Sequence, residues 1–228
     1  MLRRAFACAL CVIVSTWTAT TFAQAVGDLS GCPAPAGDAT VASGAREGAA
    51  EKFTRPEESV PTNKRSACGL YLTATDAFAM VSENSAKVLF IDVRTPGELQ
   101  FIGMPTIVDA NVPVFLAASP PQWDAATSSL KLVPNADFVA EVDRRLAQKK
   151  LSRDATVVVI CQGGIRAARA ADALTKAGFT TVYTVIDGFE GDPVAEGPNK
   201  GQRLVNGWRN AGLPWTTKLE RSKMYGLD

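Results

Sequence analysis

The chain has 228 residues, of which 24 are Lys or Arg and 23 are Asp or Glu, and 46% of its residues are hydrophobic. This length and composition suit one globular domain with additional segments. The absence of histidine from the sequence excludes histidine-based catalytic triads and histidine metal sites. A formal charge of +1 gives no basic or acidic excess that would indicate binding to nucleic acid or to a membrane surface.

The first 25 residues have the organisation of a secretory signal peptide. Arg3 and Arg4 provide a positive start, and residues 5–17 form an apolar stretch that is short for a membrane span. A small-x-small cleavage pattern follows at residues 23–25, and cleavage after Ala23 is an alternative. We therefore expect a periplasmic protein without a stable membrane span; an N-terminal membrane anchor is the alternative.

Residues 26–69 are expected to be an extension or linker, because they hold few large apolar residues from which to build a core. Cys32, Cys68 and Cys161 remain after signal removal, and an odd count in an oxidising compartment leaves one thiol free. The expected disulfide joins Cys32 to Cys68. Alternatives are that both stay reduced, or that Cys32 is lipidated within a Leu-Ser-Gly-Cys box.

The domain begins with a helix and a strand. Residues 73–85 predict a helix with a polar N-terminal cap, and residues 88–93 predict a buried strand. Asp92 and Arg94 lie at the carboxyl end of this strand, where α/β proteins place their sites. The spacing of Arg94 and Glu98 predicts an ion pair that fixes the turn.

Residues 114–134 form a long insertion, in which Trp123 is either a lid over the site or an anchor for the loop. We favour the anchor. A helix is predicted from Asn135 to about residue 150, with its apolar side chains inward. Its basic side chains are expected in solvent: Arg144, Arg145, Lys149 and Lys150.

Residues 155–160 are apolar and β-branched, which predicts a strand covered on both faces, and residues 165–177 have helical spacing. Cys161 therefore lies between a strand and a helix N-terminus, where free N–H groups and the helix dipole favour a thiolate. Gly163 and Gly164 allow several N–H groups to converge on one point. The alternative is a buried cysteine that packs as a small hydrophobic residue.

Three further segments complete the chain: a strand over residues 181–186, a Gly/Pro-rich insertion over 187–201 that we expect to border the site, and a short helix over 204–210. We expect Trp208 in the core and a polar tail over residues 216–228. Since strands alternate with helices, the predicted fold is α/β, with a parallel-dominated sheet covered by helices on both faces.

The sequence Cys161-Gln-Gly-Gly-Ile-Arg166-Ala resembles the active-site loop of the rhodanese-like sulfurtransferase family. Related phosphatases have a loop one residue longer. Residues 91–99 resemble the Asp-Val-Arg…Glu-Phe segment of the family, and later landmarks extend the resemblance over about residues 70–215. The sequence departs from the family pattern at Gly103, where a histidine is common.

The resemblance implies a single rhodanese-like domain over residues 70–215 that transfers sulfane sulfur through a persulfide on Cys161. The donor would be a small sulfur-containing anion such as thiosulfate, the acceptor a thiol or cyanide, and no cofactor or metal is implied. Arg166 would either attract the donor or brace the loop. The backbone that holds the transferred sulfur would come from the substrate-binding loop, formed by Gln162, Gly163, Gly164 and Ile165.

Three alternative functions remain at this stage. A persulfide carrier or sulfur/redox sensor would share every residue named above and would differ only in lacking turnover. A phosphatase or arsenate reductase would need a longer loop. A thiol–disulfide oxidoreductase would need a second cysteine close to Cys161, and no Cys-x-x-Cys pattern includes Cys161.

Overall fold

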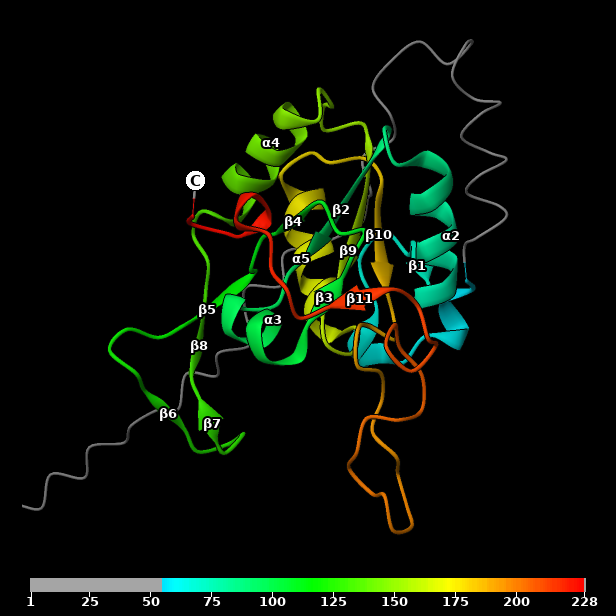
Figure 1. Cartoon of the computed structure of the whole chain (residues 1–228), viewed down its shortest axis with the longest axis vertical. Coiled ribbons are helices and arrows are strands. Elements are labelled where there is room, and N and C mark those ends of the chain that lie inside the picture. Colours follow the sequence, from blue (N-terminus) through cyan, green and yellow to red (C-terminus); the bar gives the residue numbers. More distant parts are fainter. Residues whose placement is uncertain (1–54, 228) are drawn as a thin grey trace, which may run out of the picture. The chain divides into compact units, whose positions relative to one another are not determined.

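The computed structural model describes residues 55–227 (Figure 1). The predicted signal peptide, most of the extension, and Cys32 lie outside these residues. Among the described residues, no helix has both the length and the apolar character needed to cross a membrane.

A parallel five-stranded sheet forms the centre of the domain, in the order β1-β10-β9-β2-β4 (Figure 1). Ile91 of β2 pairs with Val159 of β9, and every residue of β2 is buried. Such continuous burial requires cover on both faces of the sheet. The strands of this sheet are β1 (Tyr71–Leu72), β2 (Val88–Asp92), β4 (Ala110–Asn111), β9 (Thr156–Ile160) and β10 (Val182–Val185).

Alternating strand residues divide the core into two layers, because successive side chains point to opposite faces of a sheet. Leu89 and Val157 pack with α4 (Phe138–Gln148) and α5 (Ile165–Lys176) on one face. Phe90 packs on the other face with α2 (Ala74–Asn84), α3 (Pro96–Ile102) and Trp208. The α/β prediction is therefore confirmed.

The helix starts follow the expected capping chemistry. Thr73 caps α2 and Thr95 caps α3, each in a capping box whose acidic partner lies three residues later, Asp76 and Glu98 respectively. In α4 the cap differs from the prediction, because the helix begins at Phe138 and Asp137 occupies the N-cap position without a side-chain hydrogen bond.

The expectation that the basic side chains of α4 face solvent is wrong for two residues. Arg145 is 3% exposed and donates hydrogen bonds to Glu141 and to the carbonyl oxygens of Ser222 and Met224. Lys149 forms an ion pair with Asp109 at 2.7 Å. The C-terminal residues therefore pack on the domain, where η3 (Arg221–Lys223) lies against α4 through Arg145.

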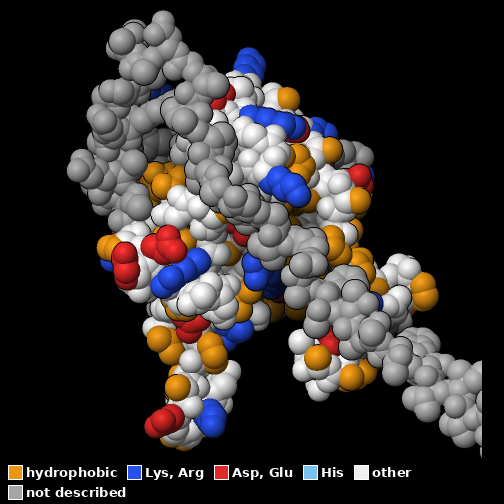
Figure 2. All heavy atoms as spheres, turned by 180° about the vertical axis from the view of Figure 1, so that it is seen from behind, with side chains coloured by type: hydrophobic (Ala, Val, Ile, Leu, Met, Phe, Trp, Pro, Cys, Tyr) orange, Lys and Arg blue, Asp and Glu red, His pale blue; other side chains and the backbone are white. Residues whose placement is uncertain are grey.

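The insertion over residues 114–134 forms two short antiparallel ribbons that project from the sheet (Figure 1). Trp123 is 65% exposed at the outer ribbon, so the prediction that it anchors the loop is wrong. Figure 2 shows apolar side chains on the surface of this projection, at the lower right of that view. The ribbons are β5 (Phe115–Ala117) with β8 (Leu132–Pro134), and β6 (Trp123–Asp124) with β7 (Ser129–Leu130).

Residues 204–210 form turns instead of the predicted helix, although Trp208 is fully buried as expected. The cause is Gly207, whose φ is +100° and whose backbone lies against Gly191. A residue with a side chain would clash there, so the chain turns. The segment then continues into β11 (Trp215–Thr216), which pairs with β3 (Met104–Pro105).

The residues that precede β1 pack closely against the domain. They form η1 (Glu57–Ser59) and η2 (Thr62–Lys64), and Val60 between them is 1% exposed. The backbone N–H of Ala67 donates to Asp172 of α5. Cys68 is held in a disulfide, but its predicted partner lies outside the described residues, so the pairing with Cys32 stays a prediction.

Candidate functional site

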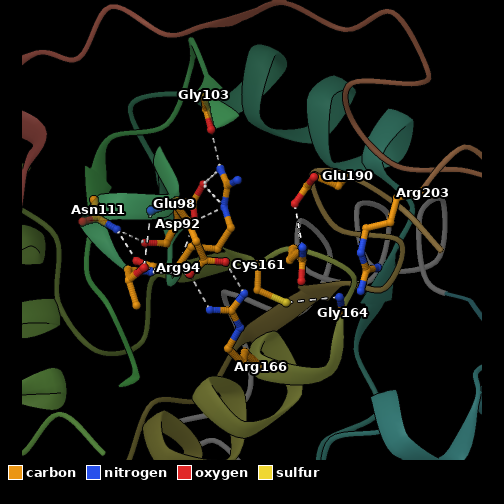
Figure 3. Close-up of polar contacts among 12 residues, drawn as sticks. Asp92, Arg94, Glu98, Gly103, Asn111, Cys161, Gly164, Arg166, Glu190 and Arg203 are labelled. Atoms are coloured by element: carbon orange, nitrogen blue, oxygen red, sulfur yellow. Dashed lines mark hydrogen bonds and ion pairs between the residues drawn. The ribbon is translucent and has the colours of Figure 1, made fainter. Parts of the chain in front are cut away.

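The predicted active loop connects the carboxyl end of β9 to the N-terminus of α5 (Figure 3). Cys161 is a free thiol and is 1% exposed. The backbone N–H of Gly164 donates to Cys161 Sγ at 3.1 Å. Gly164 has φ +98° and caps α5, and an added Cβ would collide with the carbonyl of Ile186. Glycine is therefore required at the position that turns this N–H toward the sulfur.

The segment that follows β10 fixes the orientation of the loop through backbone hydrogen bonds. The N–H of Phe189 donates to the carbonyl of Cys161 at 2.8 Å, and the N–H of Glu190 donates to the carbonyl of Gln162 at 2.9 Å. The Gln162 side chain also donates to Glu190 at 2.7 Å. These contacts occupy the carbonyls of Cys161 and Gln162 and fix the start of the loop.

Most backbone N–H groups of the loop have no acceptor in the described part of the protein and can donate to a ligand. Within the part of the chain that the structure describes, four of these groups donate to no protein acceptor, namely those of Gln162, Gly163, Ile165 and Arg166. Together with the N–H of Gly164, they place five donors at the N-terminus of α5, which is the chemistry of an anion site.

Arg166 pairs with Glu98, which corrects the predicted Arg94–Glu98 pair. The two terminal nitrogens of Arg166 donate to the two oxygens of Glu98 at 2.7 and 2.6 Å (Figure 3). Burial lowers the pKa of Arg166, but hydrogen bonds and charge from Glu98, and the charges of Cys161 and Asp92, raise it above its ordinary value. This bidentate geometry fastens α5 to α3, so the structure favours the bracing role of Arg166.

Arg94 instead forms a fully buried pair with Asp92. Both side chains are 0% exposed, and Arg94 Nη2 lies 2.6 Å from Asp92 Oδ2. The same nitrogen donates to the carbonyl of Gly103, and the guanidinium lies 4.3 Å from the ring centre of Phe189. Asn111 donates to the carbonyls of Asp92 and Arg94. This network holds the turn into α3, which presents Glu98 to Arg166.

Glu98→Gln is expected to destabilise the protein at neutral pH, with a loss that disappears in acid. Burial alone would raise the pKa of Glu98, but the hydrogen bonds and charge of Arg166 and the hydrogen bonds of Thr95 outweigh it and hold the pKa below 4.5. A carboxyl whose folded pKa is lowered stabilises the fold above its unfolded pKa, and this stabilisation is lost as pH falls through the folded pKa.

Thermal unfolding midpoints of wild type and Glu98→Gln, measured from neutral pH down to below the folded pKa of Glu98, test that expectation. Glu58→Gln is the matched control, since Glu58 is exposed, and it should change the midpoint little at any pH. A difference between wild type and Glu98→Gln that stays constant from neutral to acidic pH would contradict the assignment.

A pocket of about 430 Å³ opens beside Cys161. The predicted loop supplies part of its lining: Cys161, Gln162, Gly163, Ile165 and Arg166. The expectation that the insertion over 187–201 borders the site is confirmed, because Asp192 and Pro193 also line the pocket.

Sequence reasoning missed three lining residues: Asn63, Lys64 and Arg203. Lys64 forms an ion pair with Asp192 at 2.6 Å and is only 7% exposed. Because Lys64 comes from η2, more than 90 residues before Cys161, nothing local in the sequence indicates its place. The sequence feature that could have indicated a place for Arg203 at the pocket is its position just after the Gly/Pro-rich insertion.

The described residues contain no group of three or more His, Cys, Asp or Glu side chains that could hold a metal ion. The chemical groups that the site does offer are one sulfur nucleophile, a ring of N–H donors and nearby cations.

Comparison with known proteins identifies the family to which the chain belongs. The model of the rhodanese-like domain matches residues 73–191, more than half of the chain. An uncharacterized protein, RC0915 of Rickettsia conorii, is 29% identical over 63% of this chain and 94% of its own length. The crystal structure of Rv0390 from M. tuberculosis is 32% identical, covers 65% of this chain and 97% of its own, and has a TM-score of 0.48.

A second solved structure is the polysulfide-sulfur transferase homodimer of Wolinella succinogenes, which is 26% identical over 64% of this chain and 77% of its own, with a TM-score of 0.34. The family match spans β2, the loop around Cys161 and β10, whereas Lys64 and Arg203 lie outside it. The chain therefore belongs to the rhodanese-like domain family, a family of sulfur-transfer proteins.

Proposed function

We propose that this protein is a sulfurtransferase that carries sulfane sulfur as a persulfide on Cys161. The observation that supports it most is the relation of Cys161 Sγ to the loop: the N–H of Gly164 donates to the sulfur, and four neighbouring N–H groups have no protein acceptor among the described residues. Such a ring can stabilise a negative charge on a sulfur atom bonded to Cys161, as an oxyanion hole stabilises an oxygen.

With thiosulfate as donor, the Cys161 thiolate attacks the outer sulfur. A bond forms between Cys161 Sγ and that sulfur, the sulfur–sulfur bond of thiosulfate breaks, and sulfite leaves with the electron pair. The products are a Cys161 persulfide anion and sulfite, so charge and atoms balance. A nucleophile such as cyanide or a thiolate then attacks the outer sulfur and restores the Cys161 thiolate.

Arg166 is proposed as a positioning residue in this reaction. Its terminal nitrogens are both occupied by Glu98, so its charge is shared with a carboxylate and its geometry is fixed. It would thereby keep the start of α5, and with it the N–H groups, aimed at the sulfur. The charge that attracts the donor anion would then come from the loop N–H groups and from another cation of the pocket.

The test is a steady-state assay with thiosulfate as donor and cyanide as acceptor. The proposal predicts that thiocyanate and sulfite appear in equal amounts over many turnovers. A persulfide that forms on Cys161 but is never passed on would contradict catalysis and favour the carrier or sensor. Failure to form a persulfide with thiosulfate, mercaptopyruvate or polysulfide would contradict the proposal as a whole.

We also propose that the protein works in the periplasm. Two features support this location: the signal-peptide pattern of the first 25 residues and the disulfide at Cys68, since disulfides persist in oxidising compartments. A mature N-terminus at residue 24 or 26 in the periplasmic fraction is the expected result. An uncleaved chain in the cytoplasm would contradict it.

A further inference from the structure

The Gly/Pro-rich insertion is an ordered hairpin that returns to the pocket. Pro193 and Arg203 form an antiparallel bridge, and the N–H of Val194 donates to the carbonyl of Gln202 at 2.9 Å. Asn206 clamps the base of this hairpin through hydrogen bonds to the backbone and side chain of Asp192. The pairing places Arg203, ten residues beyond Pro193, at the pocket wall beside it.

The Arg203 guanidinium lies directly over the active loop. A Cβ built on Gly163 would come within 2.8 Å of Arg203 Nη1, so the absence of a side chain at Gly163 leaves room for this cation. The same nitrogen donates to the carbonyl of Gly191, which fixes one edge of the guanidinium. In Figure 3, Arg203 and Arg166 approach from opposite sides of Cys161.

Three cations line the pocket, and they differ in their partners. Lys64 is paired with Asp192, and Arg166 is paired with Glu98. Arg203 forms no ion pair with any residue that the structure describes. An arginine whose charge is not neutralised, beside a ring of unused N–H donors, creates a positive potential where an anion would enter.

We propose that Arg203 is the specificity-determining residue for the sulfur donor and holds the oxyanion end of a donor such as a thiosulfate or thiosulfonate. This inference rests on the proposed sulfur transfer. The loop N–H groups receive the sulfur that is transferred, and Arg203, on the far side of Gly163, receives the oxygens of the leaving group. Arg203 then stabilises the negative charge that develops on the leaving sulfite.

A series of donors with different charge tests this role. Thiosulfate carries two negative charges, benzenethiosulfonate one, and dimethyl trisulfide none. For Arg203→Gln, we expect KM for thiosulfate to rise about 10- to 100-fold, the range expected for a lost charge-assisted hydrogen bond. With dimethyl trisulfide, the Cys161 thiolate attacks the central sulfur, methanethiolate leaves, and Cys161 gains a methyldisulfanyl group. The rate of this mass change should be the same in Arg203→Gln as in wild type. Arg203→Lys should restore most of the thiosulfate activity.

Lys200→Gln is the matched control, because it removes a cation from the exposed tip of the same hairpin without touching the pocket. Its donor preference should equal that of wild type. Equal losses with all three donors in Arg203→Gln would show a structural role and overturn the inference. If Arg203→Gln reacts with all three donors as wild type does, with an unchanged KM for thiosulfate, the inference is overturned and the proposed function remains intact. Failure of every donor to load wild-type Cys161 would overturn both.

Discussion

Cys161→Ser is expected to lower sulfur transfer at least about 10³-fold, because a serine hydroxyl is not ionised at neutral pH and cannot carry a persulfide. The change replaces one atom in a buried position, so the fold should persist. The measurement is thiocyanate formation from thiosulfate and cyanide, with the circular dichroism spectrum as the control for folding. Retained turnover in a folded Cys161→Ser variant would show that the sulfur passes elsewhere.

Asp92→Asn is expected to reduce the free energy of unfolding by about 3–5 kcal/mol, since it leaves Arg94 as an unpaired buried charge. Both side chains are fully buried, and Arg94 Nη1 already lacks a hydrogen-bond partner. Among the described residues, no other carboxylate forms an ion pair with Arg94 that could replace the charge of Asp92. Urea unfolding of wild type and variant gives the difference directly.

Asp143→Asn is the matched control, because Asp143 and Arg153 form an ion pair at 2.6 Å on the surface. Water screens that pair, so its loss should leave the unfolding midpoint nearly unchanged. If the two variants lose similar stability, the buried pair is not the structural support that its geometry indicates.

The core of the candidate site could be predicted because it is local in the sequence. The strand, the two glycines and the helix around Cys161 are adjacent, and each responds to its own propensity and chemistry. The structure confirmed the order of these elements and the burial of Trp208. It also confirmed that the Gly/Pro-rich insertion borders the pocket.

Partner choice across the fold could not be predicted from spacing. Arg94 and Glu98 are four residues apart, but each has a better partner elsewhere. Asp92 lies beside Arg94 in the buried turn, and Arg166, 68 residues beyond Glu98, meets it from α5. The pairing of charges depends on which helices and strands the fold brings into contact, and spacing along the sequence does not reveal those contacts.

Two of the three cations that line the pocket, Lys64 and Arg203, were missed for the same reason. Lys64 reaches the site from a short 3₁₀ turn in a stretch with few apolar residues, which predicts a loose extension. Arg203 reaches it through a hairpin held by one isolated bridge, a few backbone hydrogen bonds and Asn206. Neither arrangement has a periodic pattern that sequence reading could detect.

Intact-mass analysis of the purified protein before and after thiosulfate, followed by peptide mapping, tests the central claim most directly. The account predicts a gain of one sulfur atom, located on Cys161, that cyanide removes and that a second addition of thiosulfate restores. A protein that turns thiosulfate over while Cys161 never carries the extra sulfur would contradict it.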